Sequence, residues 1–328
     1  MKRLILYSVL TALVVIPMAA QDLFPGLGEQ RVGISAFTFL KIAPDPRGAS
    51  LGESFTAISD DASAVYWNPA GIVRTGRNEV QFAQTSWFAD ISHRFAALTY
   101  QVTSSDAIGL SLLSLSTDPI PVRTVTQPTG TGQSFTYMDL AIGLSYSRRM
   151  TDQFSFGVTA RYLHETIAEL TMTNVVFDLG AFYATGFGSS RFAIVLSHFG
   201  NVSHPTGSVT NERVGEINTF EEFSPPTQFR LGFAIEPWQD ENNRLTTTVQ
   251  LNHPNDNAEH ISIGAEYAWS ELIMLRIGYR FNVQEQTSPM FGIGVRVPVG
   301  DLAARADYAA VPYSFLGTVH RIAIQLSL

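Results

Sequence analysis

The most constraining feature of this sequence is an apolar alternation with a period of two that recurs from Glu79 to the C-terminus. In the run from Met138 to Ser147, for example, large apolar residues alternate with Asp, Ala, Gly and Ser. Successive side chains of a β-strand point to opposite faces of the sheet, so each run predicts a strand with one apolar face and one small or polar face. About fourteen such runs are present, with expected spans of 79–88, 92–102, 107–116, 136–147, 153–164, 172–185, 191–200, 226–236, 244–252, 259–269, 272–282, 289–298, 301–309 and 317–328.

The connections between these runs alternate in length. Every second connection is short and polar, whereas the other series includes two long excursions, 117–135 and 201–225. Bacterial outer-membrane barrels have an even number of strands, short periplasmic turns and longer outer loops. We therefore expect an all-β fold, a 14-stranded antiparallel transmembrane β-barrel formed by residues 79–328, although the link near Ala89 is also short. The short connections begin at Thr103, Arg148, Gly186, Pro237, Trp269 and Val299.

Composition favours a lipid-facing protein and excludes several other classes. Charged residues make up 15% of the chain, against about 25% in soluble proteins, and the expected partner of the apolar outer face is outer-membrane lipid. The net charge of -8 disfavours nucleic acid, because phosphate neutralisation needs clustered Lys and Arg. The absence of Cys excludes disulfides, thiolate metal sites and a cysteine nucleophile.

Residues 1–20 have the pattern of a signal peptide. Lys2 and Arg3 precede an apolar core from Leu4 to Ile16, and small residues follow before Gln21. The alternative is a membrane anchor, but this apolar run is shorter than the ~20 residues that a spanning helix needs. We expect export, cleavage after residue 20 and a location in the bacterial outer membrane.

Residues 21–78 differ from everything that follows, because they are rich in Gly, Pro and Asp and lack the alternation. We interpret them as a plug-like N-terminal segment that the barrel surrounds. We expect its acids Asp45, Glu53, Asp60 and Asp61 to dock against Arg residues on the inner face of the wall. The charged residues expected to face the lumen are Arg161, Asp178, Arg230, Glu266, Arg276, Arg280, Arg296, Arg305, Asp307 and Arg321.

Catalytic motifs are weak throughout. The series Gly48, Ser50, Gly52 matches the G-x-S-x-G elbow of hydrolases, but that elbow needs a preceding strand, and Pro44 and Pro46 disfavour one. The favoured interpretation is that these small residues allow close backbone packing against the wall. The His residues lack the spacing of a zinc-protease motif. We expect no enzyme activity, no metal and no cofactor.

Two blocks of the N-terminal segment resemble the signature of the PorV/PorQ family of outer-membrane proteins: Ala43 to Gly52 and Asp60 to Gly71. The second block is also similar to the wider group of FadL-like transporters. Later landmarks at 87–91, 139–146 and 177–180 extend the resemblance over essentially the whole mature chain. The motif residues are Pro44, Asp45, Arg47, Gly48, Gly52, Asp60, Asp61, Trp67, Asn68, Pro69, Ala70 and Gly71.

The resemblance implies two alternative functions. A PorV-like role is non-enzymatic and lies in type IX secretion, where a barrel receives cargo from the translocon and passes it to surface attachment. A FadL-like role is transport of hydrophobic small molecules across the wall. A secretion partner needs apolar side chains on its outer loops, and the candidates in the second long loop are Phe220, Phe223, Pro225 and Pro226.

Overall fold

The computed structural model describes residues 33–211, 215–300 and 302–328. The expected signal peptide and the first part of the N-terminal segment lie outside these residues. Within the described part, no helix has the length and apolar character needed to cross a membrane.

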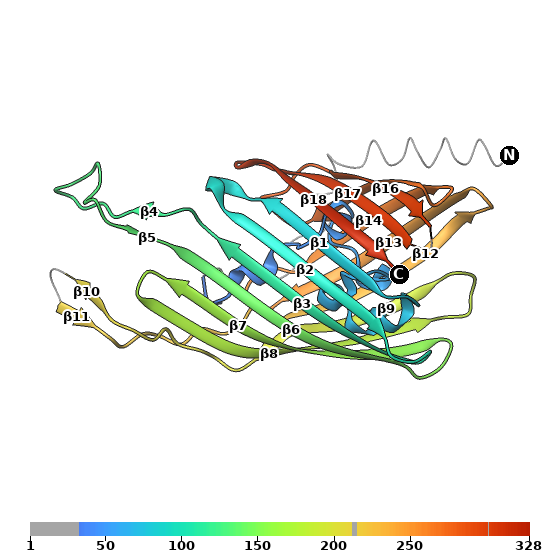
Figure 1. The fold of residues 1–328 in the computed structure, drawn as a ribbon, viewed down its shortest axis with the longest axis horizontal. Helices are drawn as coiled ribbons and strands as arrows, with labels where there is room; N and C mark the ends of the chain where they lie inside the picture. The colour runs from blue at the N-terminus through green and yellow to red at the C-terminus, as the bar shows by residue number, and fades with distance from the viewer. Residues whose placement is uncertain (1–32, 212–214, 301) are drawn as a thin grey trace.

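The described residues form a closed antiparallel barrel of fourteen strands (Figure 1). Each strand pairs with its neighbours along the chain, and β1 pairs with β18 to close the sheet. Every expected span overlaps one barrel strand, so the predicted strand number and order are confirmed. The barrel strands are β1 (Glu79–Ser86), β2 (Ser92–Gln101), β3 (Asp106–Ser116), β6 (Tyr137–Arg149), β7 (Phe154–Ile167), β8 (Leu170–Ala184), β9 (Arg191–Gly200), β12 (Gln228–Gln239), β13 (Asn243–Pro254), β14 (His260–Trp269), β15 (Ile273–Phe281), β16 (Met290–Val299), β17 (Leu302–Tyr313) and β18 (Gly317–Ser327).

Several strand edges lie a few residues from their expected positions, and one of these differences has a clear physical reason. Residues 237–239 were expected to begin a turn, yet β12 continues to Gln239. The register against β13 shifts between Ile235 and Trp238, which indicates a bulge. A bulge tolerates Pro237 inside the strand, because proline has no N–H to contribute to the ladder.

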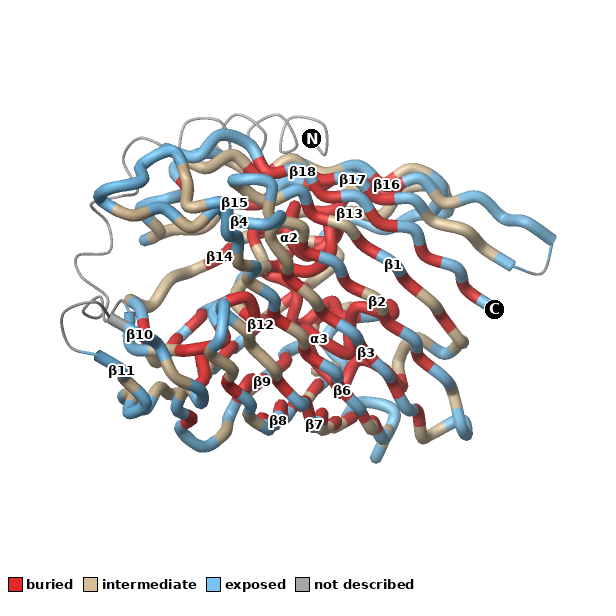
Figure 2. The backbone as a smooth tube through the Cα atoms, turned by 60° about the vertical axis from the view of Figure 1, so that its left-hand side comes forward, coloured by how far each residue is buried: buried red, intermediate tan, exposed pale blue. Residues whose placement is uncertain are grey.

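The two faces of the sheet differ as the alternation predicts. On β6, Leu144 is 59% exposed on the outer face, whereas its neighbour Ser145 is 1% exposed. The same contrast recurs around the wall, so buried and exposed positions alternate along the strands (Figure 2). The outer surface of the barrel is therefore largely apolar, and its inner surface is small, polar or charged.

Residues 35–74 lie inside the barrel (Figures 1 and 2). Most of their side chains are buried, including Trp67, Tyr66 and Phe55. Proline stands first in two of the short helices here, where its fixed φ and missing N–H suit a helix start. We call this stretch the interior segment; its elements are η2 (Thr38–Lys41), α2 (Pro46–Ser50), η3 (Thr56–Ile58), α3 (Ala64–Trp67) and η4 (Pro69–Arg74).

The two long connections extend well beyond one rim of the barrel (Figure 1). Each contains a small two-stranded sheet that the alternation did not predict: β4 (Ile120–Pro121) with β5 (Ser134–Phe135), and β10 (Val209–Asn211) with β11 (Gly215–Ile217). Two or three residues per strand are too few to show a period of two. We call this rim the long-loop rim and the opposite one the short-turn rim.

Candidate functional site: how the wall holds the interior segment

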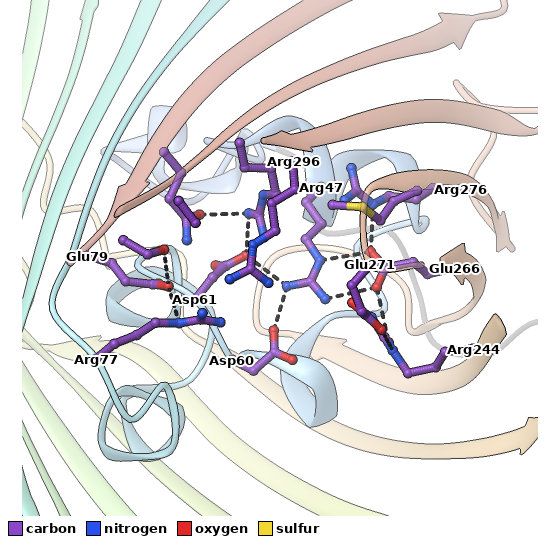
Figure 3. A pocket seen from close by; sticks show the side chains of 15 residues that line it. Arg47, Asp60, Asp61, Arg77, Glu79, Arg244, Glu266, Glu271, Arg276 and Arg296 are labelled. Atoms are coloured by element: carbon purple, nitrogen blue, oxygen red, sulfur yellow. Dashed lines mark hydrogen bonds and ion pairs between the residues drawn. The ribbon is translucent and has the colours of Figure 1, made fainter. Parts of the chain in front are cut away.

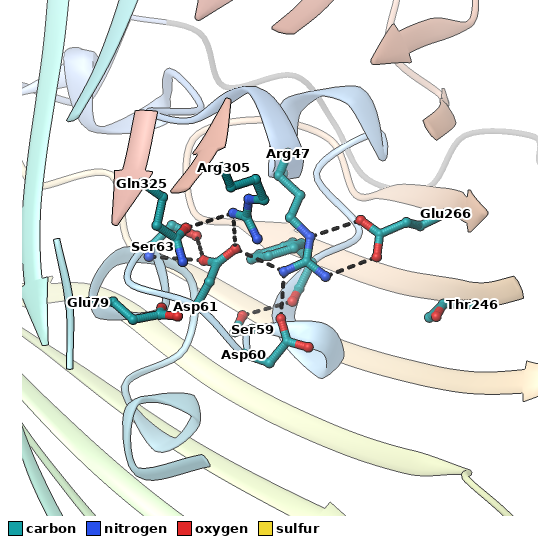
Figure 4. Close-up of polar contacts among 12 residues, drawn as sticks. Arg47, Ser59, Asp60, Asp61, Ser63, Glu79, Thr246, Glu266, Arg305 and Gln325 are labelled. Atoms are coloured by element: carbon teal, nitrogen blue, oxygen red, sulfur yellow. Dashed lines mark hydrogen bonds and ion pairs between the residues drawn. The ribbon is translucent and has the colours of Figure 1, made fainter. Parts of the chain in front are cut away.

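Arg47 on α2 connects the interior segment to the wall. Its Nε and Nη2 donate to the two carboxylate oxygens of Glu266 on β14, at 2.9 and 3.0 Å. Its Nη1 donates to Asp61 at 2.8 Å and also to Asp60 (Figure 4). The planar guanidinium suits this forked, charge-assisted contact, which a lysine could not reproduce.

The contacts of Glu266 and Asp61 continue along the wall and close on themselves. Glu266 accepts from Arg276 at 2.7 Å, and Arg276 donates to Asp307 at 2.6 Å. Arg305 then donates to Asp307 and to Asp61, both at 2.7 Å. The result is a closed ring of three arginines and three acids in alternation, which we call the ionic ring: Arg47, Glu266, Arg276, Asp307, Arg305 and Asp61.

The ionic ring is buried and carries no net charge. Burial of an unpaired charge is costly, so each member requires its neighbours. Burial alone would raise the pKa of Asp61, but Arg305 and Arg47, with a hydrogen bond from Ser63, hold it well below its ordinary value. Asp61 is therefore a carboxylate at neutral pH, and it joins the interior segment to β17.

The ionic ring borders a small cavity of about 80 Å³ at the short-turn rim (Figure 3). On this side Arg77 pairs with Glu79 at 3.1 Å, and Arg244 pairs with Glu271 at 2.7 Å. Arg296 also lines the cavity, and within the described residues its side chain makes no ion pair. The space is small, and every charged residue that lines it except Arg296 is ion-paired among the described residues, which is unlike a catalytic pocket.

Asp45 does not dock on the wall, so that expectation was wrong. Its carboxylate caps α2 by accepting from the Gly48 N–H at 2.8 Å and also accepts from Trp67 Nε1 at 2.5 Å. Burial and the charge of Asp61 raise the pKa of Asp45 to about 6, although the two hydrogen bonds lower it. Asp60 likewise bonds Arg47 of its own segment and not the wall. Of the four acids, Asp61 and Glu53 contact wall arginines, the latter through Arg280 at 2.9 Å.

Small residues on both surfaces allow the backbone of the segment to touch the wall. Gly52 has a φ of +68°, and a Cβ there would lie 2.9 Å from the Tyr279 backbone nitrogen. The expected close packing of this glycine against the wall is therefore observed. Ser50 ends the short helix and donates to the Arg47 carbonyl oxygen, in a geometry unlike a nucleophile elbow.

The second half of the motif, Asn68 to Gly71, docks without charge. The Asn68 side chain accepts from the Ala70 N–H and donates to the Thr56 carbonyl, both at 3.0 Å. Pro69 and Ala70 lie directly against Gly157 of β7, where any Cβ would collide with their backbone. A Cβ on Gly180 of β8 would instead meet side-chain atoms, the nearest being the Asn68 amide oxygen.

The remaining expected lumen residues lie on the inner face but not in one cluster. Arg161 and Asp178 form a separate buried pair at 2.8 Å. The Arg230 guanidinium lies over the Trp67 ring, 5.4 Å from its centroid. Arg321 donates to the Ala43 carbonyl at 3.3 Å.

Some of the residues that hold the interior segment were not predicted from the sequence. Gln250 of β13 donates to the Glu53 carbonyl at 3.0 Å and accepts from the Thr56 N–H at 3.1 Å. The wall glycines were also missed, although the alternation had already assigned Gly157 to the polar face. The repeated occurrence of glycine on the polar face of the strands was the pattern from which these contacts could have been predicted.

The four expected partner-binding residues are less exposed than a docking surface requires. Pro225 and Pro226 are buried, and Phe223 packs against the buried core. Phe220 is half-buried. The backbone of Phe223 pairs with Ser203. Phe223, Pro225 and Pro226 contact other residues at the base of the loop. Contact of the four residues with a partner stays a prediction.

Comparison with known proteins decides the family. A family model described as Type IX secretion system protein PorV matches residues 27–254. The chain belongs to the PorV family. The resemblance found in its N-terminal motif is thereby confirmed, and a search among curated proteins found no match.

Solved structures show where the PorV-family fold has been seen before. The CymD monoaromatic hydrocarbon channel is 12% identical, with a TM-score of 0.58, over 89% of this chain and 98% of its own. The Ralstonia pickettii toluene transporter TbuX is 13% identical, with a TM-score of 0.56, over 90% and 98%. A Pseudomonas aeruginosa FadL homologue is 11% identical, with a TM-score of 0.54, over 87% and 97%. At these identities the likeness establishes the fold alone.

Proposed function

We propose that this protein is a plugged, non-enzymatic outer-membrane barrel that binds and hands over cargo proteins during type IX secretion or surface attachment. Membership of the PorV family supports the pathway. The observation that most directly supports a binding role is the ionic ring, which ties the interior segment to β14 and β17 on one side of the barrel, with β15 completing the ring. A barrel filled in this way is suited to presenting a surface and unsuited to conducting a polypeptide.

The proposed orientation follows from the asymmetry of the two rims. The apolar outer face would contact outer-membrane lipid, and the short turns would face the periplasm. The long-loop rim, with its two projecting hairpins, would then face outward and receive cargo and the translocon. Residues 1–20 would direct export, and residues 21–78 would form the plug inside the barrel of residues 79–328.

A second candidate is transport of hydrophobic small molecules. The FadL-like fold favours it, because solved relatives are described as hydrocarbon and toluene transporters. This chain also has an apolar hollow of about 260 Å³ on β14 and β15, lined in part by Ile263, Ile277 and Phe281. The hollow is local and does not by itself form a route across the wall.

Removal of a projecting hairpin tests the secretion role. We expect deletion of residues 122–133, between β4 and β5, to abolish co-purification of secreted cargo from a host that has a type IX translocon. The barrel itself should remain folded, as judged by its heat-dependent gel migration. A matched control replaces the short turn 186–188, at the opposite rim, with three serines and should retain cargo.

The competing role predicts a different result. If the deletion variant still captures cargo and the intact protein binds toluene saturably, the secretion proposal is wrong and transport is favoured. The intact protein should instead show no saturable toluene binding.

A further inference from the structure

A second cavity at the short-turn rim is distinct from the one beneath the ionic ring. It has a volume of about 350 Å³, within the range of small-ligand sites. One side is formed by residues 57–60 of the interior segment and by Arg74, the last residue of η4. The other side is formed by the end of β8 and by the turn 186–190, which leads into β9.

Arg74 is the unusual residue of this cavity. Its guanidinium lies over the Phe182 ring, 4.0 Å from the centroid. Within the described residues it makes no ion pair and no side-chain hydrogen bond, and its Nη1 is buried without an acceptor. Arginines held partly out of water normally have a carboxylate or carbonyl partner, so an exception calls for an explanation.

The surroundings of Arg74 add positive charge. Burial lowers the pKa of Arg74, and the nearby Arg149 and Arg191 lower it further. Arg191 is neutralised by Glu236 at 2.7 Å, but Arg149 donates to the uncharged Val73 carbonyl at 3.0 Å. Two of the three guanidinium groups therefore lack a carboxylate among the described residues. An added anion would relieve this repulsion.

The cavity also contains a neutral donor. Ser189 Oγ accepts from the Glu236 N–H at 2.8 Å, which orients the hydroxyl. Its proton has no acceptor among the described residues and is free to donate to a ligand. Asp60 lines the same side of the cavity as Arg74 and has a half-exposed carboxylate, which would disfavour a highly charged anion near it.

We propose that this cavity is a binding site for a small carboxylate- or phosphate-bearing anion that enters from the short-turn side and is held by Arg74. A guanidinium matches both oxyanions, because two parallel N–H groups can meet two oxygens. The site is independent of the secretion role, since it lies at the rim opposite the projecting hairpins. In the proposed orientation the ligand would come from the periplasm.

The test is calorimetric titration of the full-length protein in neutral detergent at low ionic strength. Succinate and inorganic phosphate serve as separate probes and distinguish a carboxylate from a phosphate site. We expect one or both to bind, and Arg74→Gln to weaken binding by roughly tenfold or more, the usual worth of a charge-assisted hydrogen bond. Arg123→Gln removes one exposed charge from the β4–β5 hairpin and should leave binding unchanged.

A second variant separates the proposal from a folding defect. Asp60→Asn removes the negative charge at the edge of the cavity, so it should tighten binding of the same probe while Arg74→Gln weakens it. A loss of structure cannot produce changes of opposite sign. The proposal is overturned if neither probe binds, if Arg123→Gln weakens binding as much as Arg74→Gln, or if Asp60→Asn weakens binding.

Discussion

The two halves of the N-terminal motif attach to the barrel by different physical means. The first half, around α2, is held through the ionic ring with β14, β15 and β17. The second half, around η4, is held mainly by shape, as Pro69 and Ala70 lie against Gly157 of β7. Among the described residues no ion pair joins η4 to the wall, although Arg149 donates to the Val73 carbonyl. Both halves belong to one short segment, yet one attachment depends on ion pairs and the other on glycines in the wall, which leave room for the backbone of the segment.

The difference predicts how each attachment responds to change. Buried ion pairs contribute little net stability when intact, but removal of one partner leaves an uncompensated buried charge. A glycine contact tolerates a change of charge or pH and fails when volume is added. The α2 attachment should therefore be sensitive to charge and pH, and the η4 attachment to side-chain size.

The largest effect is expected from Glu266→Gln on the charged side. This change leaves Arg47 and Arg276 facing a neutral amide in a buried site, at a cost of about 3–5 kcal/mol in the free energy of unfolding. Urea unfolding in lipid vesicles would measure it. Proteolysis of the interior segment should also become faster, because the ionic ring joins that segment to the wall.

Glu271→Gln is the matched control for this prediction. Glu271 also pairs with an arginine, at 2.7 Å, but its side chain is 53% exposed. An exposed pair contributes about 0–1 kcal/mol. If the two variants were destabilised equally, the ionic ring would have no special role in holding α2.

The contrast between the α2 and η4 attachments also explains which contacts could be predicted from the sequence. Alternation assigned Glu266 and Arg305 to the inner face, because period two is a local property of a strand. It could not identify Arg47 as the partner of Glu266, since the two are separated by 219 positions. Their meeting depends on the stagger of the strands and on the path of the interior segment.

The glycine attachment shows a different limit of sequence reasoning. The alternation placed Gly157 on the inner face, but a glycine in a sequence does not indicate which group packs against it. Only the folded barrel brings the Pro69 backbone there. Likewise, Asp45 was expected to meet an arginine and instead caps its own helix by accepting from the N–H of Gly48, three positions along the chain.

A pH effect of intermediate size is expected on the charged side. The pKa of Asp45 is raised from 3.8 to about 6, so the folded protein binds a proton more tightly than the unfolded chain does. Its contribution to stability is therefore greatest below about pH 4 and falls as the pH rises through 6, by about 2–3 kcal/mol. Asp45→Asn should remove this part of the pH dependence, as measured by urea unfolding between pH 4 and 7.

Asp240→Asn provides the comparison for that experiment. Asp240 is an exposed turn residue whose pKa is lowered by hydrogen bonds, first from the Asn242 N–H. This shift is opposite in direction to that of Asp45, so replacing Asp240 should leave in place the fall in the free energy of unfolding as the pH rises from 4 to 6. If the free energy of unfolding of Asp45→Asn changed with pH as it does in the wild type, another group would be responsible for the pH dependence.

The smallest effect is expected from Gly157→Ala on the uncharged side. One added methyl group collides with the Pro69 and Ala70 backbone, which cannot move as freely as a side chain. Overpacking of this kind costs about 1–3 kcal/mol, and the cost should not vary between pH 4 and 7, because no titratable group takes part. Ala160→Val adds more volume on the exposed outer face of the same strand and should change the unfolding free energy by less than about 0.5 kcal/mol. A Gly157→Ala penalty that changed with pH in parallel with the titration of Asp45 would show that the two attachments are coupled, so that the fit of η4 depends on the α2 attachment.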